Sequence, residues 1–290
     1  MKKVLIIGKD AYLASGLKFD KSKVETDFVG RFAEVEDWDQ YDTVVNFCIQ
    51  PEHYSRLLSN EEMIDVQIAK RLNPKTNFVF LSSRKVYGSH VELDQYRETD
   101  PLQPYDYYSK NKVNIEHQLQ QILGDRLLIL RTGNIVGIPP RHNSPTFINW
   151  LKSELENYQH VVVTADRTAV KDFVTKDYFQ YVLKTAVENG LTGIYNVGSG
   201  FGITIEDLLT RLVAPQKLKF EQKEDRGEQF ILNCDKLHQV AKALTKEELF
   251  KTCERVKTYM EIKNEPNPSI PSVGQQLCPV RRNNSAQYPR

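Results

Sequence analysis

Residues 3–8 have the sequence KVLIIG, an apolar run that ends in glycine. This pattern is typical of a strand in the middle of a parallel sheet, where both faces of the strand are buried. Residues 10–18, which follow, are compatible with a helix. A strand that leads through glycine into a helix can bind a pyrophosphate at the helix N-terminus. Taken alone, such a segment is more often an ordinary strand–turn–helix than a cofactor loop, so other segments must decide between the two interpretations.

Further strands and helices alternate along the chain. The strands are expected at 24–29, at 43–48 (TVVNFC), at 78–82 (FVFLS), at 127–131 and at 161–163. Helical spacing of apolar residues covers 61–72 and 107–123. Strands that alternate with helices predict a parallel sheet covered on both faces, which is an α/β fold. Only a short interval separates Gly8 from Asn46, so a strand–helix unit between them is expected to be shortened or missing.

The composition limits the kinds of partner. The chain has 290 residues, is 40% hydrophobic, and carries 39 basic and 38 acidic residues. This balance argues against nucleic acid or a membrane as the main partner. The four cysteines, Cys48, Cys234, Cys253 and Cys278, form no CxxC pair, so we expect reduced thiols and no metal site. No apolar stretch is long enough for a signal peptide or a membrane span, and a cytoplasmic location is expected.

A tyrosine and a lysine at helical spacing are the first candidates for chemistry. Hydride transfer at a carbinol carbon needs a proton to move on the attached oxygen, and a phenol beside an ammonium can do this. Tyr108 and Lys112 lie four residues apart, on one face of the helix expected at 107–123. Tyr259 and Lys263 have the same spacing. Only Tyr108 follows a buried strand that ends in two serines, Ser82 and Ser83, and ligands bind at that end of a parallel sheet.

Taken together, several motifs resemble the NAD-dependent epimerase/dehydratase branch of the extended short-chain dehydrogenases, over roughly residues 3–260. The resemblance rests on FVFLSSRKVYG at 78–88, on ETDPLQP at 98–104 followed by YSKNK at 108–112 and Glu116, and on LRTGNIVG at 130–137. It also rests on KDFV at 171–174 with Asp177, on YNVG at 195–198, and on RGE at 226–228.

The resemblance implies a fold and a division of the chain. The fold is a Rossmann-like, doubly wound parallel sheet with a smaller C-terminal substrate-binding domain. Residues 1–165 would form the dinucleotide-binding domain, to which 168–200 partly return, and 166–262 would form the substrate-binding region. Residues 264–290 contain many prolines and little periodicity, and we expect them to form a flexible tail.

The resemblance also implies roles for individual residues. Tyr108 would exchange a proton with the substrate oxygen, Lys112 would lower the pKa of Tyr108 and bind the nicotinamide ribose, and Ser83 would orient the same oxygen. Asn134, Lys171 and Arg226 would bind a nucleotide-activated sugar together with Ser83. The dinucleotide cofactor would be bound by Gly8, Ala11, Tyr12, Leu13, Arg31, Cys48, Ser82, Tyr108 and Lys112.

Two departures from the family pattern concern phosphate binding. The usual turn has three glycines at the spacing GxxGxxG, whereas this chain has Gly8, Ala11 and Ala14. Each alanine adds a methyl group where the backbone must approach the phosphates. Lys171 replaces the usual arginine, which keeps the charge and loses the bidentate fork that suits phosphate.

The choice between NAD and NADP depends on the second strand. A carboxylate at its end would accept hydrogen bonds from the adenosine ribose and favour NAD. The segment VETDFVGR ends in Arg31, which could pair with the 2′-phosphate of NADP, and Asp27 is the rival if the register slips. We therefore favour NADP slightly.

Three outcomes remain for the reaction. Dehydratases of the family carry Asp-Glu after the position of Ser83, where this chain has Arg84 and Lys85. Together with the compact length and Arg31, this favours a reductase of a 4-keto-6-deoxy sugar nucleotide over a redox-neutral 4-epimerase. A non-catalytic dinucleotide-binding sensor is the third possibility, favoured by the altered glycine turn and opposed by Ser83, Tyr108 and Lys112.

Relatives pair the two helices at 61–72 and 107–123 across a two-fold axis, so the resemblance implies a homodimer. The apolar residues Met63, Ile64, Val66, Ile68 and Leu72 of the first helix, with Val113, Ile115 and Ile122 of the second, are the candidates for that interface.

Overall fold

A six-stranded parallel sheet forms the centre of the protein in a computed structural model, which describes residues 1–31, 33–88, 95–141, 146–221 and 229–262. The strands are β1 (Lys2–Ile7), β2 (Val24–Val29), β3 (Thr43–Asn46), β4 (Asn77–Ser83), β5 (Leu127–Thr132) and β10 (Gly193–Val197). Their order across the sheet is β10-β5-β4-β3-β1-β2. This order reverses between β1 and β3, which makes the carboxyl ends of these two strands the expected place for a ligand.

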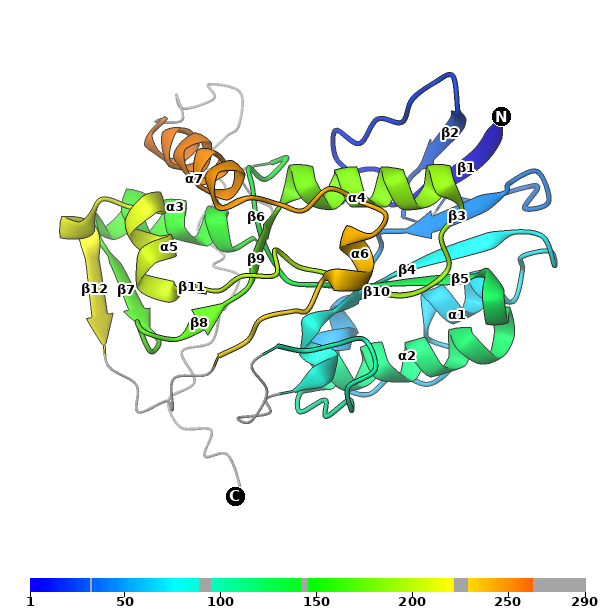
Figure 1. Ribbon diagram of the computed structural model, residues 1–290, viewed down its shortest axis with the longest axis horizontal. Helices are drawn as coiled ribbons and strands as arrows, with labels where there is room; N and C mark the ends of the chain where they lie inside the picture. Colours follow the sequence, from blue (N-terminus) through cyan, green and yellow to red (C-terminus); the bar gives the residue numbers. More distant parts are fainter. Residues whose placement is uncertain (32, 89–94, 142–145, 222–228, 263–290) are drawn as a thin grey trace, which may run out of the picture.

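Helices cover both faces of this sheet (Figure 1). On one face lie α1 (Ile64–Ala69) and α2 (Tyr107–Leu123), and on the other lies α4 (Lys176–Asn189). Alternate residues of each strand point to opposite faces, so Leu5 packs toward α1 and α2 whereas Val4 and Ile6 pack on the side of α4. The fold is therefore the predicted Rossmann-like α/β fold.

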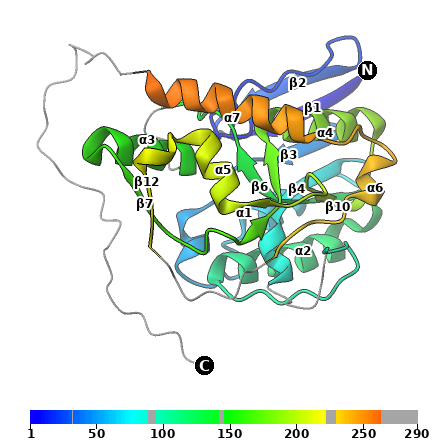
Figure 2. The same cartoon turned by 60° about the vertical axis from the view of Figure 1, so that its left-hand side comes forward.

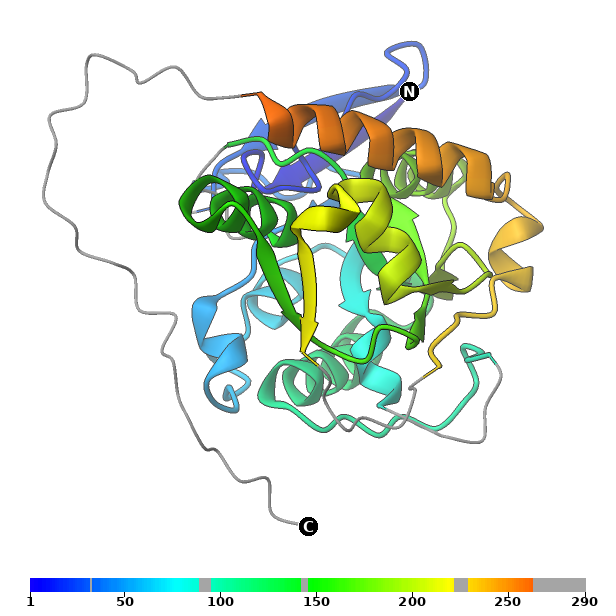
Figure 3. The same cartoon turned by 90° about the vertical axis from the view of Figure 1, so that its left-hand side faces the viewer.

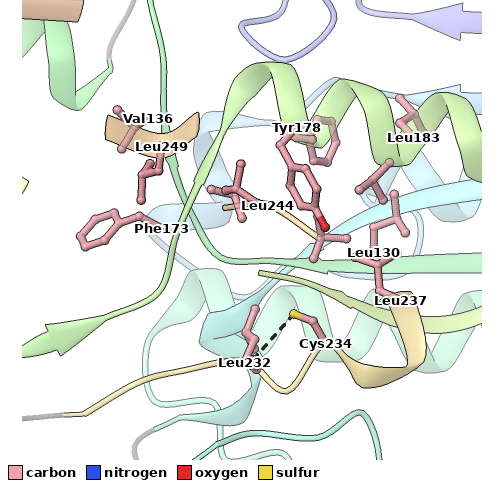
Figure 4. Packing of buried hydrophobic residues seen from close by; sticks show 14 of the residues in the cluster. Leu130, Val136, Phe173, Tyr178, Leu183, Leu232, Cys234, Leu237, Leu244 and Leu249 are labelled. Carbon is pink, nitrogen blue, oxygen red and sulfur yellow. Dashed lines mark hydrogen bonds between the residues drawn. The ribbon is translucent and has the colours of Figure 1, made fainter. Parts of the chain in front are cut away.

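The core on the α4 side also joins the later segments of the chain. Figure 4 shows Tyr178 and Leu183 of α4 above Leu130 of β5, with Leu237 of α6 (Asp235–His238) beside them. Leu249 of α7 (Lys246–Glu261) belongs to the same buried cluster. These contacts fix α6 and α7 against the central sheet.

A smaller group of elements lies beside the carboxyl ends of the central strands (Figures 2 and 3). Three short strand pairs form it: β6 with β9, β7 with β12 and β8 with β11. Its helices are α3 and α5, and α7 contacts both of them. The bounds are β6 Asn134–Val136, α3 Phe147–Tyr158, β7 Val161–Thr164, β8 Val170–Lys171, β9 Phe173–Thr175, β11 Ile203–Thr204, α5 Ile205–Leu212 and β12 Leu218–Glu221.

The helix predicted at residues 10–18 is wrong. Residues 9–16 form turns, in which Ser15 N donates to Ala11 O at 2.9 Å but Ala11 N and Ala14 N make shorter-range bonds. Gly16 has φ +78°, a left-handed conformation that ends a helix. Between β2 and β3, the described residues contain no helix either. The interval from Gly8 to Asn46 is therefore shortened, as predicted.

The helix predicted at 61–72 is shorter than expected, because α1 covers only Ile64–Ala69. Its start is delayed because the Glu62 carboxylate pairs with Arg56 and accepts a hydrogen bond from Ser59 N at 2.9 Å, which holds this segment in a loop. At the other end, Asn73 precedes Pro74, a position where the helical conformation is disfavoured. The predicted helix at 107–123 and the strand at 24–29 have the predicted bounds.

The three cysteines in the described part of the chain, Cys48, Cys234 and Cys253, are free thiols. Cys278, Arg226 and the tail at 264–290 lie outside the described residues. Within the described residues no helix is both long and apolar enough to cross a membrane.

Candidate active site

A cavity of about 500 Å³ lies at the carboxyl ends of β1, β3, β4 and β5. It runs from the turn after β1 to the first turns of α2. Most of the predicted cofactor and catalytic residues line it, namely Ala11, Tyr12, Leu13, Cys48, Ser82, Ser83, Tyr108 and Lys112. The structure therefore brings to one cavity residues that are far apart along the chain.

The start of α2 is fixed by a capping box. Asp106 accepts a hydrogen bond from Ser109 N at 2.7 Å, and Ser109 Oγ accepts one from Asp106 N at 3.2 Å. The Asp106 carboxylate also pairs with Lys85 Nζ at 2.8 Å. Because the cap sets where the helix begins, it places Tyr108 in the first turn, facing the end of β4.

Ser83, Tyr108 and Lys112 meet at this place. The Ser83 hydroxyl lies beside the Tyr108 phenol and lowers its pKa. Lys112 Nζ donates to the carbonyl oxygen of Leu81 at 2.7 Å and lies 5.8 Å from the centroid of the Tyr108 ring. The three side chains form the arrangement that a proton exchange on a substrate oxygen requires.

The surroundings shift the proton affinity of both groups. Burial raises the pKa of Tyr108, and the Ser83 hydroxyl and the Lys85 charge oppose this rise. Burial lowers the pKa of Lys112, and the carboxylates of Asp65 and Glu116 oppose this fall. Lys85 Nζ lies 5.8 Å from the Tyr108 ring centroid. Lys85 is therefore a second ammonium beside the phenol.

The two serines at the end of β4 have different partners. Ser82 Oγ donates to Glu116 Oε1 at 2.5 Å, and Glu116 pairs with Arg131 at 2.6 Å in a fully buried ion pair. This contact holds the Ser82 side chain, while Ser83 faces Tyr108. Of the two hydroxyls, Ser83 is the one placed for substrate.

The turn after β1 approaches β3 closely. Gly8 has φ +86°, and a Cβ atom there would lie 2.9 Å from Cys48 Sγ. Tyr12 Oη donates to the carbonyl oxygen of Gly137 at 3.0 Å, and Gln180 of α4 donates to the carbonyl oxygen of Leu13 at 2.9 Å. The turn is held in place by these distant segments, since it lacks a helix of its own.

A dinucleotide fits this cavity at its nicotinamide end. Glycine at position 8 leaves space beside Cys48 that a side chain would fill. The cavity continues from Ala11–Leu13 to Lys112, and along it the ring, the ribose and the pyrophosphate of the cofactor would need hydrogen-bond donors. The helix N-terminus that commonly binds the pyrophosphate is missing among residues 9–16. Backbone groups of the turn would have to replace it.

Arg31 and Asp27, the two residues that could select between NADP and NAD, lie at different places along the second strand. Asp27 pairs with Leu5 in the middle of β2, and its carboxylate accepts a hydrogen bond from Tyr41 Oη at 2.9 Å. Arg31 follows β2, and its charge opposes the rise that burial causes in the pKa of Cys48. Arg31 thus lies at the carboxyl edge of the sheet, near Cys48, although it is not among the described residues that line the cavity.

The predicted sugar-nucleotide residues are only partly gathered. Asn134 Nδ2 donates to the Asp172 carbonyl oxygen at 2.9 Å, and Asn134 Oδ1 accepts from Arg84 Nε at 3.1 Å. Lys171 lies on β8, beside Ile203 of β11 and Phe230. Neither Asn134 nor Lys171 belongs to the described lining of the cavity, and Arg226 cannot be placed.

Four residues that were not predicted make contacts in or beside the cavity. Asn46 and Asp65 line the cavity and hydrogen-bond each other at 2.8 Å. Tyr54 also lines it and stacks on Tyr108, with ring centroids 5.0 Å apart and planes 4° apart. Lys85 is the fourth. Asn46, a polar residue at the end of an apolar strand, was detectable from the sequence, whereas Tyr54 lies in a segment without periodicity.

Known proteins resemble this chain in fold. The structure of dTDP-glucose 4,6-dehydratase from Bacillus anthracis in complex with NAD has a TM-score of 0.70 at 13% identity, covering 90% of this chain and 97% of that chain. UDP-N-acetylglucosamine 4-epimerase from Methanobrevibacter ruminantium has a TM-score of 0.71 at 16% identity, covering 89% and 97%. RMD from Pseudomonas aeruginosa complexed with NADPH has a TM-score of 0.67 at 16% identity, covering 89% and 99%.

No curated protein sequence matches the chain. The structural likenesses, at such low identity, establish the fold alone. The family comparison goes further, because residues 30–198, more than half of the chain, match the family described as NAD dependent epimerase/dehydratase. This segment contains Ser83, Tyr108 and Lys112. The chain belongs to the NAD dependent epimerase/dehydratase family.

Proposed function

We propose that this protein is an NAD(P)-dependent oxidoreductase that acts on a nucleotide-activated sugar and reduces a 4-keto-6-deoxy sugar nucleotide. The observation that carries the proposal is that Ser83, Tyr108 and Lys112 line one cavity, which begins at the turn after β1, with Lys112 Nζ 5.8 Å from the Tyr108 ring centroid. The structural relatives named above include a dTDP-glucose 4,6-dehydratase in complex with NAD, a UDP-N-acetylglucosamine 4-epimerase, and a protein complexed with NADPH.

A bound nicotinamide would supply the hydride that reduces the keto carbon. Tyr108 Oη donates its proton to the oxygen that becomes the new hydroxyl, and Ser83 Oγ holds that oxygen in place. Burial keeps Tyr108 protonated before the step by raising its pKa. The ammonium groups of Lys85 and Lys112 then stabilise the phenolate that remains.

Arg84 and Lys85 support reduction over dehydration. Dehydration requires an acid and a base beside the sugar, and these positions carry cations instead. Lys85 pairs with Asp106, and Arg84 binds Asn134 and lies 4.6 Å from the Phe230 ring centroid. Neither side chain can remove a proton from the sugar as a carboxylate would.

NADP is the proposed cofactor. Arg31 follows β2 at the carboxyl edge of the sheet, and Asp27, the residue that would favour NAD, is mid-strand and hydrogen-bonded to Tyr41. A guanidinium at this edge suits a 2′-phosphate.

Homodimerisation through α1 and α2 remains a further proposal, as do the cytoplasmic location and the domain boundaries. Met63, Val66 and Ile68 are already buried within the chain, while Ile64, Leu72, Val113 and Ile122 are only partly buried. These four would provide the apolar contact. Sedimentation at micromolar concentration should therefore report a dimer, and a stable monomer would contradict the proposal.

The experiment that tests the function incubates purified protein with NADPH or NADH and a panel of UDP-, dTDP-, GDP- and CDP-linked 4-keto sugars. Consumption of NADPH with one of them is the expected result. Turnover without net change in nicotinamide absorbance would indicate the epimerase instead. Binding of cofactor without turnover of any sugar would indicate a sensor.

A further inference from the structure

A buried carboxylate, Asp65, lies in the wall of the cavity. Its residue is 4% exposed, and its neighbours on α1, Val66, Ile68 and Ala69, are buried apolar residues. Asp65 Oδ1 accepts a hydrogen bond from Asn46 Nδ2 at 2.8 Å. Neutral donors compensate only part of the desolvation of a buried carboxylate, so a cation nearby would stabilise its charge.

Lys112 is a buried cation in the same wall. Its residue is 6% exposed, and Nζ donates one hydrogen bond, to the Leu81 carbonyl oxygen. An ammonium has three protons to donate. Lys112 is absent from the direct ion pairs formed by the described residues, so its charge is balanced at longer range.

Among the titratable groups near Lys112, one candidate remains for the negative charge that compensates its ammonium group. On its own helix, Glu116 is engaged by Arg131 and Ser82, and burial keeps Tyr108 protonated. From residues 51–54, His53 faces Lys112, and burial together with the Lys112 charge lowers the pKa of His53 to about 4, so it is neutral at pH 7. From α1, Asp65 remains.

The charges of Asp65 and Lys112 affect each other in both directions. Asp65 favours the protonated form of Lys112 and is the largest influence that opposes the effect of burial. Burial raises the pKa of Asp65, and Lys112 is the largest influence that opposes this rise and favours the ionised form. Both side chains line the same cavity, on helices that pack against each other, and no direct ion pair joins them among the described residues.

We propose that Asp65 is a positioning residue, the buried counter-ion that keeps Lys112 protonated and directs it toward a ribose hydroxyl of the bound cofactor. This inference rests on the proposed function for the identity of the cofactor. The pairing of the two charges is independent of it, because the pairing follows from the residues alone.

The test is a double-mutant cycle on the full chain, with Asp65→Asn, Lys112→Met and the two combined. Each single change leaves one buried charge without its partner, whereas the double change removes both. We expect the melting temperature of the double variant to lie above that of Lys112→Met, although it carries one more substitution. If the losses in melting temperature of the two single variants add up to the loss of the double variant, the proposal is overturned. Glu61→Gln, an exposed carboxylate just before α1, is the matched control and should show no coupling with Lys112→Met.

A second measurement separates a charge effect from a packing effect. NADPH affinity is titrated against pH by nicotinamide fluorescence. In Asp65→Asn, Lys112 loses its proton at lower pH, so the alkaline decline in affinity should move down by about one pH unit. Asp65→Glu should restore the wild-type profile. An unchanged profile in Asp65→Asn would overturn the proposal.

The outcomes distinguish this inference from the proposed function. Lack of turnover with every sugar nucleotide would defeat the proposed reaction and leave the thermal coupling intact. Additive thermal losses would defeat the pairing even if the enzyme proved to be a reductase. If Asp65→Asn fails to fold alone, recovery of folding in the double variant supports the pairing, and failure to recover overturns it.

Discussion

The end of β4 with the start of α2, and the turn after β1, line one cavity but are built differently. At β4 and α2, regular elements position every reacting group: Ser83 ends a strand, and the Asp106 cap places Tyr108 in the first turn of a helix. The turn after β1 has no helix behind it. It depends on side chains from elsewhere, such as Gln180 of α4 on the Leu13 carbonyl oxygen.

Under the proposed function, proton transfer and cofactor binding would therefore depend on separate parts of the molecule. The catalytic edge has the local hydrogen bonds of intact secondary structure. The turn after β1 relies on tertiary contacts, including Lys176 Nζ, which donates to Ser15 Oγ at 2.6 Å. Changes at the first region should therefore affect turnover, and changes at the second should affect cofactor affinity or stability.

The largest effect is expected at the catalytic edge. Tyr108→Phe removes the proton donor and keeps the ring that stacks on Tyr54. Turnover should fall by roughly two orders of magnitude or more, the usual scale for a lost general acid, while cofactor affinity stays near that of the wild type. Steady-state kinetics and a fluorescence titration of NADPH measure the two quantities. Tyr259→Phe is the control, since Tyr259 shares the spacing to a lysine but hydrogen-bonds Asn149 away from the cavity. Equal losses in both variants would refute the assignment.

The next effect concerns the other region. Arg31→Ala should weaken NADPH binding by roughly ten- to a hundredfold, the range for one charge-assisted contact, and leave NADH nearly unchanged. Added salt should reduce the difference between the affinities of the wild type for NADPH and for NADH, because salt screens an exposed ionic contact. Calorimetry with both cofactors measures this, with the exposed Lys21→Ala as control. Tighter binding of NADH than of NADPH by the wild type would indicate that NAD is the cofactor.

The stability of the protein should depend on pH through His53, which lies near Lys112. Burial lowers the pKa of His53 to about 4, and the Lys112 charge adds to this. A histidine in the unfolded chain has a pKa of about 6.5. Between these values the unfolded state binds the extra proton, so stability falls as pH drops below 6.5, by about 2 kcal/mol at pH 5. Urea unfolding at pH 7 and pH 5 should show this loss in the wild type and a smaller loss in His53→Gln. The exposed His117→Gln should behave as the wild type; equal pH slopes in all three proteins would exclude the effect.

The smallest effect compares two glycines of the turn. Gly8 and Gly16 both have positive φ, +86° and +78°, so alanine at either position should cost about 1–2 kcal/mol of stability. Only at position 8 would the new Cβ meet another atom, Cys48 Sγ at 2.9 Å. Urea unfolding should therefore show that Gly8→Ala is the more destabilising by about 1 kcal/mol. Adding Cys48→Ala should reduce that difference, and equal losses at both glycines would show that the close approach is unimportant.

Prediction from sequence succeeded where local signals and tertiary structure agree. The bounds of β2 and α2 were predicted as found. Ser83, Tyr108 and Lys112 were expected together, because Ser83 ends a strand and the other two residues lie four apart on one helix face. The helix at 10–18 was wrongly predicted, because alanine and leucine favour a helix in any context and the left-handed Gly16 gives no clear signal.

Other parts of the site depend on tertiary structure. Asp65 lies in an apolar helical pattern, where a carboxylate is normally expected on the exposed face. Its place opposite Lys112 follows only from how α1 packs against α2. Tyr54 reaches Tyr108 from a segment without periodicity. Asn134, which the resemblance places beside the sugar, hydrogen-bonds Arg84 and the Asp172 carbonyl oxygen, and neither partner can be read from spacing.

The most direct test of the central claim follows the hydride itself. The protein is incubated with a 4-keto-6-deoxy sugar nucleotide and NADPH that carries deuterium at the transferred position, and the product is analysed by mass spectrometry and NMR. The proposed reaction predicts one deuterium at C4 of the sugar for each NADP⁺ formed, with little product from Tyr108→Phe. A sugar inverted at C4 without deuterium, or no turnover with any member of the panel, would contradict the claim that this cavity reduces a nucleotide-activated sugar.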